Sequence, residues 1–282
     1  MNILAVGIAT LDLVFGTDHY PAEDEETRAQ SLRISRGGNA TNTLVMLSQL
    51  GHACRWAGVL ANTPESAIIT GELDQYCIDY RHAARHTGRP PTSSITLTAR
   101  SRTIVHYRDL PELTADEFAA VPLHDVQWVH FEGRAIAELR RMIARVRAEC
   151  PPCTVSLEAE KWRDQLESVL PLPDVLIAGK ALAAHLDLNT PAAMLDWLRA
   201  RSPQARIALA WGEQGAFGDA DGQRLHAAAA RIDRPVDTLG AGDAFNAGLI
   251  DALARNLSFS QALAHANSIA ARKCMQHGFA LS

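Results

Sequence analysis

The feature that most constrains the fold is an alternation of two apolar patterns after about residue 112. Short strand-like runs at 125–132, 154–159, 174–178 and 206–211 are separated by longer stretches with apolar residues at helical spacing. The first of these stretches carries Ile136, Leu139, Met142, Ile143 and Val146. Parallel strands need long crossover connections, which are usually helices, so this order predicts a parallel sheet with helices on both faces. We therefore expect an α/β core.

Two helix starts can be placed from local signals. Thr114-Ala115-Asp116-Glu117 has the form of a capping box, in which the Thr and Glu side chains accept hydrogen bonds from each other's backbone N–H groups. Thr190-Pro191 puts a capping residue directly before a proline, which is favoured at the first helical position. Each pattern predicts that a helix begins there.

The first third of the chain differs, because strand-like segments follow one another with few long helices between them. These segments are 13–20, 28–35, 93–98 and 102–108. They predict a small separate β-sheet that closes over a neighbouring loop as a lid. We place the lid in residues 13–35 and 88–108, and the core in residues 1–12, 36–87 and 109–282.

Composition excludes several classes of protein. The 282-residue chain carries a net charge of −5, and its 27 basic residues are scattered among 32 acidic ones, so it offers no broad positive surface to a nucleic-acid backbone. No apolar run approaches the roughly 20 residues that cross a bilayer, and no basic flank precedes the first apolar run. We expect a cytoplasmic protein that binds neither nucleic acid nor membrane.

The cysteines argue for reduced thiols, because five is an odd number and disulfides are rare in the cytoplasm. Cys150-Pro151-Pro152-Cys153 has the spacing of a redox motif. It follows a helical pattern and precedes a strand-like run, so no helix start is available to lower a thiol pKa. A redox function is therefore disfavoured.

The segment Asp237-Thr238-Leu239-Gly240-Ala241-Gly242-Asp243 opens a predicted helix, since Phe245, Leu249 and Leu253 follow it at intervals of four. Free N–H groups and the positive dipole of a helix start stabilise an anion such as a phosphoryl group in transfer. Asp243 can accept the proton of an attacking hydroxyl, which accelerates a reaction by about 10²–10⁴-fold. The segment favours a phosphoryl-transfer site, although an ordinary turn with an acidic residue has the same composition.

This segment fits neither of two common nucleotide motifs. A Walker loop would need Gly-Lys-Ser/Thr at fixed spacing, and that is absent from the sequence. The dinucleotide fingerprint would need a third glycine after Gly240-x-Gly242 and a position after the first strand. A dehydrogenase is therefore disfavoured.

A second polar cluster, Arg36-Gly37-Gly38-Asn39-Ala40-Thr41-Asn42, begins a predicted helix that stops at Gly51. Asn39 and Asn42 stand three positions apart on one face of its first turn, and each amide offers donors and an acceptor to neighbouring hydroxyls of a sugar. Asp12, just past the first strand, and Asp24 add acceptors. Asparagine is also a common helix cap, so the cluster alone allows both interpretations.

Together, Gly37-Gly38-Asn39 and Asp237 to Asp243 resemble the signatures of the ribokinase-like PfkB sugar kinase family. The resemblance runs from Ile3 to Phe279 and is strongest to the ketohexokinase (fructokinase) branch. The segments that carry it are Tyr20 to Asp24, Arg36 to Asn42, Ser101 to Val105, His130 to Arg134, Glu158 to Lys161, Ala210-Trp211, Lys273-Cys274 and Gly278-Phe279. It implies a ribokinase-like fold and transfer of the ATP γ-phosphoryl group to a primary hydroxyl of a ketose, with fructose to fructose 1-phosphate as the leading case.

The same resemblance implies roles for individual residues. Asp243 would be the catalytic base, with Gly240, Ala241 and Gly242 as its anion hole. The sugar would be held by Asp12, Asp24, Gly38, Asn39, Asn42 and, from the lid, Arg102. The nucleotide would lie near Lys180, Trp211, Gly212, Glu213, Gly215, Thr238, Gly240 and Gly242. Mg²⁺ would arrive with ATP without a dedicated protein site, a monovalent cation such as K⁺ near the Asp237 loop is an additional possibility, and the lid would form a homodimer through residues 13–35 and 93–108.

The chain departs from the wider family at one motif: Gly179-Lys180-Ala181-Leu182-Ala183 replaces Asn-x-x-Glu, which in the family is linked to magnesium and phosphate handling. Two alternatives to a ketose kinase stay open. One is a kinase for another acceptor, such as ribose, a nucleoside, a sugar acid, or a sulfo- or phosphosugar. For an anionic acceptor, a spare cation would come from Arg36, Arg102 or Arg108. The other is a sugar- and nucleotide-binding regulator without turnover.

Some remaining polar residues allow weaker predictions. His82 and His86 have the i, i+4 spacing of metal ligands on a helix, but no third ligand is evident nearby. Glu132, Glu158 and Glu160 come toward the ends of predicted strands, where open α/β sheets bind ligands. These three carboxylates either order water or magnesium, or are solvated charges at strand ends.

Overall fold

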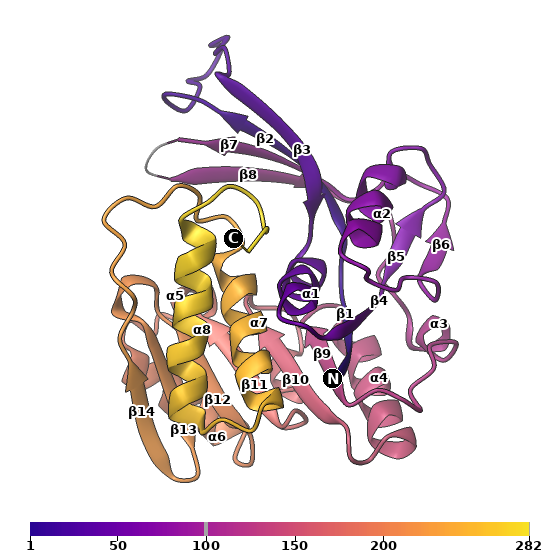
Figure 1. Ribbon diagram of the computed structural model, residues 1–282, viewed down its shortest axis with the longest axis vertical. Helices are drawn as coiled ribbons and strands as arrows, with labels where there is room; N and C mark the ends of the chain where they lie inside the picture. Colours follow the sequence, from indigo (N-terminus) through magenta and orange to yellow (C-terminus); the bar gives the residue numbers. More distant parts are fainter. Residues whose placement is uncertain (99–100, 282) are drawn as a thin grey trace.

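The computed structural model describes residues 1–98 and 101–281; residues 99 and 100 of the predicted lid, and residue 282, lie outside the described residues. Within the described residues, eight strands form the main sheet in the order β14-β13-β12-β11-β10-β9-β1-β4 (Figure 1). Their bounds are β1 Asn2–Val6, β4 Ala53–Ala57, β9 Trp128–Glu132, β10 Thr154–Ala159, β11 Val175–Gly179, β12 Arg206–Ala210, β13 Ala216–Ala220 and β14 Gln223–Ala227.

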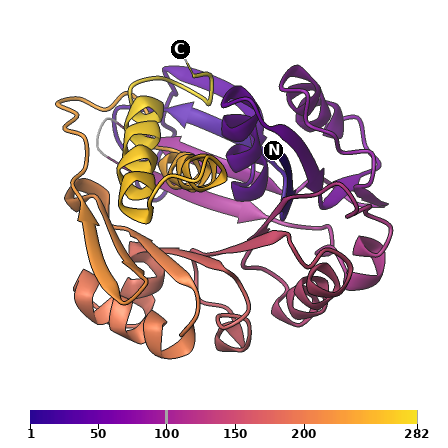
Figure 2. The ribbon, with the colours of Figure 1, turned by 60° about the horizontal axis from the view of Figure 1, so that its bottom comes forward.

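The main sheet is parallel from β4 to β12 and turns antiparallel only at β13 and β14. Helices cover both faces, as Figure 2 shows. The helices are α1 Asn39–Gln49, α2 Ser66–Gln75, α3 Ala115–Phe118, α4 Ile136–Glu149, α5 Lys180–His185, α6 Pro191–Arg201, α7 Ala241–Ala254 and α8 Phe259–Cys274, with short 3₁₀ turns at Leu166–Ser168 and Gly212–Gln214. The α/β fold with a mostly parallel sheet, predicted from the sequence, is confirmed.

Alternate residues of each strand enter the two cores, because successive side chains of a strand point to opposite faces. Leu4 on β1 packs in the core that includes α4, α5 and α6. Its neighbours Ile3 and Ala5 pack in the core that includes α1, α7 and α8. Apolar residues therefore dominate the inner strands, as expected for a sheet buried on both sides. The buried polar exceptions on β9 and β10 are His130, Glu132, Ser156 and Glu158.

Two helices begin where local signals predict them. Thr114 caps α3 with a complete capping box, since its side chain accepts from Glu117 N and the Glu117 side chain accepts from Thr114 N. Thr190 caps α6 by accepting from Ala193 N, with Pro191 as the first helical residue.

A second sheet, four strands within the described residues, stands beside the carboxyl ends of the main sheet (Figure 1). Its order is β3-β2-β7-β8, with β2 Thr10–Gly16, β3 Ser31–Gly37, β7 Thr92–Leu97 and β8 Arg102–Tyr107. The predicted strand at 13–20 instead spans Thr10–Gly16, so it begins earlier and ends earlier than the sequence pattern predicts. A short pair, β5 Val59–Ala61 and β6 Ala84–His86, lies beside α2.

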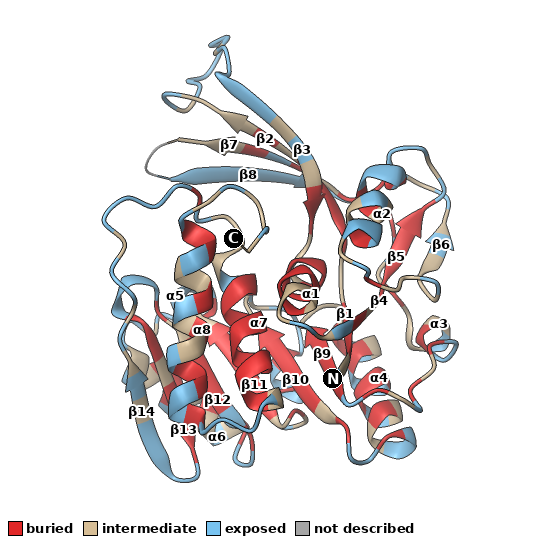
Figure 3. Cartoon of the chain, in the orientation of Figure 1, coloured by how far each residue is buried: buried red, intermediate tan, exposed pale blue. Residues whose placement is uncertain are grey.

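Figure 3 shows β8 and much of β3 exposed, and both strands carry apolar residues. The exposed fractions of these residues are 56% for Leu32 and 48% for Ile34 on β3, and 45% for Ile104, 69% for Val105 and 57% for Tyr107 on β8. No helix in the described part of the chain combines the length and the apolar character that crossing a membrane requires.

Candidate active site

A cavity of about 460 Å³ lies between the small sheet and the carboxyl ends of β1, β9 and β10. We call it the sheet-edge cavity. Open α/β sheets bind their ligands at this edge. Its wall includes Asp12, Gly38, Asn39, Asn42, Arg102, Glu132, Glu158, Glu160, Gly240, Ala241, Gly242 and Asp243. The structure thus brings together residues that the sequence spreads over more than two hundred positions.

Asp243 lies in the first turn of α7 and is buried, with 6% of its surface exposed. Its Oδ2 accepts a hydrogen bond of 2.7 Å from Asn42 Nδ2. Burial raises the pKa of Asp243 to about 8; the Asn42 hydrogen bond opposes the shift, and the charges of Glu160 and Glu132 add to it. A carboxyl group with a pKa near neutrality is well matched to proton transfer.

Gly240 begins α7 in a left-handed conformation, with φ of 78°. A Cβ atom there would stand 2.2 Å from the Phe279 ring, so both the backbone and the packing require glycine. The N–H of Ala241 donates to the Thr238 carbonyl at 3.3 Å, and those of Gly242 and Asp243 have no preceding helical turn to donate to. Gly240, Ala241 and Gly242 therefore present the positive end of a helix to the cavity beside Asp243.

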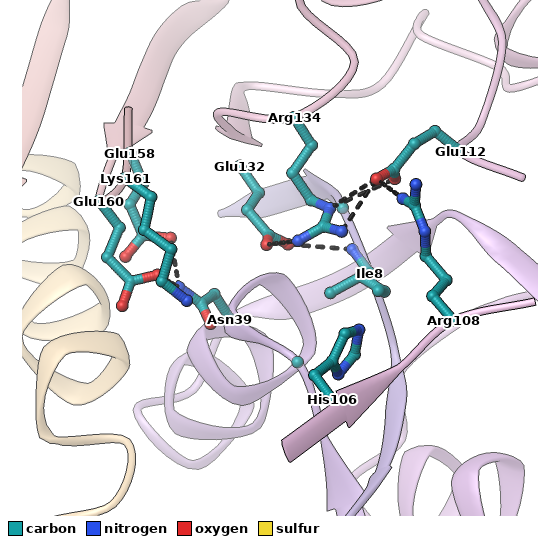
Figure 4. Close-up of polar contacts among 12 residues, drawn as sticks. Ile8, Asn39, His106, Arg108, Glu112, Glu132, Arg134, Glu158, Glu160 and Lys161 are labelled. Atoms are coloured by element: carbon teal, nitrogen blue, oxygen red, sulfur yellow. Dashed lines mark hydrogen bonds and ion pairs between the residues drawn. The ribbon is translucent and has the colours of Figure 1, made fainter. Parts of the chain in front are cut away.

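Three further carboxylates face the same cavity (Figure 4). Glu132 accepts from Ile8 N at 3.0 Å and pairs with Arg134 at 3.3 Å. Glu158 accepts from Asn246 Nδ2 at 2.7 Å. Burial, and the nearby charges of Asp243, Glu160 and Glu132, hold the pKa of Glu158 well above its usual range. Glu132 and Glu158 are thus buried cavity groups with fixed hydrogen bonds, whereas the Glu160 side chain lines the cavity and is 44% exposed.

Asp12 and Gly38 enter the cavity from the start of the small sheet. Asp12, within β2, accepts from Thr10 Oγ1 at 2.7 Å, and burial raises its pKa. Gly38 has φ of 104°, and a Cβ there would lie 2.2 Å from the Ile8 carbonyl oxygen. Glycine is therefore the residue that lets this loop pass under β1's carboxyl end.

Asn39 lies in the cavity wall with its amide already engaged. Its Nδ2 donates to Glu158 Oε2 at 3.1 Å and to Glu160 Oε2 at 3.0 Å (Figure 4). Both N–H groups are used within the protein, so the acceptor Oδ1 is the atom that stays available to a ligand.

The cavity also holds cationic side chains, most of which sequence reasoning missed. Arg102 on β8 donates to Thr238 Oγ1 at 3.3 Å and so joins the small sheet to the segment before α7. The other basic residues of the wall are His106, Arg108, Arg134, Lys161 and Arg163. The position of Arg134, Lys161 and Arg163 just after the β9 and β10 strand ends is the sequence signal that could have found them.

Asp24 does not line this cavity. It lies in the exposed loop between β2 and β3, at the far end of the small sheet, with a left-handed φ of 61°. Arg36 is also outside the sheet-edge cavity wall; its side chain lies in the wall of a neighbouring cavity of about 300 Å³. It is therefore not a spare cation for an acceptor in the sheet-edge cavity.

A cavity of about 740 Å³ lies on the other side of the α7 start. We call it the alanine-lined cavity, because its wall includes Ala210, Ala229, Ala230, Ala241, Ala270 and Ala271. Trp211, Gly212, Glu213, Gly215, Thr238 and Gly242 also line it. The Lys180 ammonium lies beside this wall, 5.8 Å from the centre of the Trp211 ring.

The two cavities share Ala241 and Gly242. A ligand in either one therefore reaches the same helix start, and Asp243 stands on the sheet-edge side of it. This arrangement can pass a negatively charged group from a ligand in one cavity to a hydroxyl in the other, with Asp243 taking the proton.

His82 and His86, whose spacing would suit metal ligands on a helix, do not lie on a helix. His82 lies in a turn and His86 ends β6, where its ring bonds Glu117. No group of three or more His, Cys, Asp or Glu side chains within the described residues is arranged to hold a metal ion.

Comparisons with known proteins give one family and one fold. The sequence profile described as "pfkB family carbohydrate kinase" matches residues 1–282. Ketohexokinase from Mus musculus is 36% identical over 290 residues, which cover 99% of this chain and 97% of that protein. The ribokinase of Giardia lamblia superposes with a TM-score of 0.84 at 15% identity, covering 99% of this chain and 94% of that one. The Arabidopsis thaliana ribokinase solved with ribose and ATP has a TM-score of 0.82 at 17% identity, covering 98% and 93%.

Proposed function

Because the chain belongs to the pfkB family of carbohydrate kinases, and is a sugar kinase, we propose that it transfers the γ-phosphoryl group of ATP to a primary hydroxyl of a ketose. Fructose, converted to fructose 1-phosphate, is the acceptor we propose first, because the 36% identical mouse protein is a ketohexokinase. The observation that carries the reaction is the α7 start shared by two cavities, with a buried carboxylate on one side.

Asp243 is the base in this proposal. Its carboxylate takes the proton of the sugar hydroxyl, the hydroxyl oxygen forms a bond to the γ-phosphorus, and the bond from that phosphorus to the bridging oxygen of ADP breaks. Gly240, Ala241 and Gly242 stabilise the charge on the phosphoryl oxygens in transit through the helix start.

We place the nucleotide in the alanine-lined cavity and the sugar in the sheet-edge cavity. Small apolar side chains in the cavity wall leave room for the flat base of a nucleotide. The same wall also contains Gly212, Glu213, Gly215 and Thr238, and it ends at the start of α7. The Lys180 ammonium lies beside Trp211, which lines the alanine-lined cavity, and there it would attract the phosphates of the nucleotide. The Arabidopsis ribokinase was solved with ribose and ATP, which is consistent with two ligands on this fold.

For the sugar, we propose contacts with Asp12, Asn39 Oδ1, the Gly38 backbone and Asn42, with Arg102 reaching over from the small sheet. Asn42 uses one N–H for Asp243, so its second N–H is left for a hydroxyl. Asp12 and Asn39 Oδ1 offer acceptors, whereas Asn42 and Arg102 offer donors, so both kinds of partner are present for the hydroxyls of a ketose.

The pairing of the arginines favours a neutral acceptor over a sugar acid or a phosphosugar. Arg108 pairs with Glu112, and Arg134 pairs with both Glu112 and Glu132 (Figure 4). Two of the cations in the wall therefore already have carboxylate partners. A sugar panel that includes anionic acceptors tests this preference.

Mg²⁺ is expected to enter as the ATP complex. The Glu158 and Glu160 oxygens in the sheet-edge wall fit this, because carboxylate oxygens suit the water ligands of such an ion. The ion would neutralise phosphate charge. We leave K⁺ out of the proposal, because the Asp237 carboxylate already pairs with Arg33 at 3.1 Å and Lys273 at 3.4 Å.

We also propose that two copies pair through the small sheets, in residues 13–35 and 93–108. The exposed apolar side chains of β3 and β8 supply the contact surface, and the free sheet edges have ladder groups to satisfy. Asp24, exposed at the far end of the sheet, would then meet a sugar only at the partner's cavity. The free thiols of all five cysteines, which lie within the described residues, support our expectation of a cytoplasmic protein.

The decisive experiment is an ATP-consumption assay across fructose, ribose, a sugar acid, a phosphosugar and a nucleoside, with product identified by phosphorus NMR. We expect fructose-dependent ADP release and a phosphate ester on a primary carbon. A preference for another acceptor would overturn the ketose assignment but keep the kinase. Binding of sugar and ATP without any ADP release would instead establish the regulator that lacks turnover.

A further inference from the structure

Arg36 is an arginine buried beneath the sheet-edge cavity without reaching into it. It is 2% exposed, and it lines the neighbouring cavity of about 300 Å³. Its Nη1 donates to Asn42 Oδ1 at 2.7 Å and to Thr41 Oγ1 at 2.8 Å. Its Nε lies 3.6 Å from Glu72 Oε2, and its guanidinium stacks over Phe279, 5.7 Å from the ring centre. Among the described side-chain hydrogen bonds, Arg36 reaches Asp243 through Asn42.

The contact with Arg36 decides which way the Asn42 amide points. An arginine side chain has donors and no acceptor, so only the amide oxygen of Asn42 can face it. The amide nitrogen must then point the other way, and there it donates to Asp243 Oδ2 at 2.7 Å. With the amide reversed, its oxygen would face the Asp243 carboxylate and its N–H₂ would face the guanidinium, and both contacts would be repulsive.

We infer that Arg36 is a positioning residue for the reaction: through Asn42, it holds the Asp243 carboxylate in place and favours its ionised, proton-accepting form. The inference rests on the proposed role of Asp243 as base. It assigns to Arg36 a function in catalysis without any contact to sugar or nucleotide.

The charges around Asp243 make this support necessary. Burial disfavours the carboxylate, and the acidic groups facing it add to that effect. They come from each packed element: Glu132 from β9, Glu158 from β10 and Glu160 just after it, and Asp12 from β2 across the cavity. Opposing them are the Asn42 hydrogen bond from α1, the charge of Arg36 from β3, and Arg102 on β8 in the cavity wall. Arg36 and Asn42 thus offset part of the effect by which burial and the neighbouring carboxylates disfavour the ionised form of Asp243.

A purely structural role for Arg36 predicts something different. Its ion pair with Glu72, and the bond from Arg36 N to Glu72 Oε1 at 2.9 Å, fasten α2 to β3. If fastening were its whole function, then breaking the pair from either side would have the same consequence.

The test compares Arg36→Met with Glu72→Gln. Both lose the same ion pair, but Arg36→Met removes a positive charge from the Asn42–Asp243 pair, whereas Glu72→Gln removes a negative one. We expect the acid limb of the kcat/KM profile to move up by about one pH unit or more in Arg36→Met, with roughly a tenfold loss of rate near neutral pH that is recovered at higher pH. In Glu72→Gln the limb should stay in place or move down. Arg36→Lys, which keeps a charge and a donor, should restore most of the wild-type profile.

A direct titration makes the result independent of turnover. The ¹³C signal of the Asp243 carboxyl group, assigned with Asp243→Asn, is followed against pH in wild type, Arg36→Met and Glu72→Gln, each shown to be folded by its thermal transition. An upward shift of the Asp243 titration in Arg36→Met alone supports the inference. The same titration midpoint in all three proteins overturns it. If the wild type phosphorylates no sugar, the proposed function fails, and the titration still decides the role of Arg36. If Arg36→Met does not fold, Arg36→Lys and Asn42→Leu replace it in the titration. An unchanged titration midpoint of Asp243 in Asn42→Leu then overturns the inference.

Discussion

Asn42 and Asp243 are 201 positions apart in the chain, and a 2.7 Å hydrogen bond joins the amide of one to the carboxylate of the other. The bond links the first turns of α1 and α7, which pack in the same core on one face of the main sheet. The two motifs at opposite ends of the sequence therefore form one structural unit, and a change in either reaches the other.

Asp243→Asn removes the proposed base but keeps the shape and the hydrogen-bonding capacity toward Asn42. We expect kcat for sugar phosphorylation to fall by about 10²–10⁴-fold, while the sugar still binds. Steady-state kinetics and calorimetric titration with sugar measure the two quantities.

The matched control is Asp251→Asn, on the same helix. Asp251 is buried and accepts from His52 and His265 at 2.9 Å each, away from both cavities. That variant should lose stability and keep its turnover per folded molecule. Near-normal kcat in Asp243→Asn would show that another group takes the proton.

The raised pKa of Asp243 also makes stability depend on pH. In the folded protein the pKa of Asp243 is about 8, against 3.8 for an ordinary aspartate, so between these values the folded state holds a proton that the unfolded chain has lost. The contribution of Asp243 to the unfolding free energy therefore declines as pH rises through this window. We expect Asp243→Asn to gain thermal stability relative to wild type from about pH 5 to about pH 8. Melting curves of both proteins measure the difference, and a difference that does not change with pH would contradict the raised pKa.

Gly240→Ala should disturb the helix start more than its backbone angle explains. The added Cβ would meet the Phe279 ring at 2.2 Å. Gly222 provides a control, since its φ of 73° is close to the 78° of Gly240 and a Cβ there meets nothing within 4 Å. Both changes carry a left-handed backbone cost of about 1–2 kcal/mol. Only Gly240→Ala is expected to lower kcat, by at least tenfold, because small misplacements of a catalytic group are costly. Equal kinetics in the two variants would remove Gly240 from the anion hole.

The proposed pairing of small sheets can be broken by a single charge. Ile34, on β3, is 48% exposed, and an aspartate there would bury a carboxylate in the interface. We expect Ile34→Asp to shift the mass measured by light scattering from dimer to monomer. Ile68→Asp changes an apolar residue that is 38% exposed on α2, outside the small sheet, and should leave the dimer intact. A wild-type monomer at working concentration would refute the pairing itself.

Local signals in the sequence were sufficient for much of the core. The caps of α3 and α6 depend on neighbouring residues, and both were predictable for that reason. The β13–β14 hairpin was not anticipated, although Asp221-Gly222 between its strands, with φ of 53° and 73°, is a typical two-residue turn signal. Its second strand, β14, is the edge strand of the main sheet, where the apolar pattern that marks inner strands weakens.

The site was harder to predict where its contacts join residues that are far apart in the sequence. Asn39 was assigned to the sugar as a free amide, but its N–H groups are taken by Glu158 and Glu160, 119 and 121 positions away. His82 and His86 were considered at helical spacing, yet the pairing of β6 with β5 makes the second one extended. Both outcomes depend on packing between distant segments, which residue spacing cannot encode.

The shared wall of the two cavities has a kinetic consequence. Among the described residues of the small sheet, several line the sheet-edge cavity and none lines the alanine-lined one. With the ligands placed as we propose, nucleotide can exchange while the small sheet covers the sugar. We then expect the sugar phosphate to leave last, as the slow step. A pulse-chase experiment tests this order: bound labelled sugar should be carried through to product, whereas bound labelled ATP should be diluted by the chase.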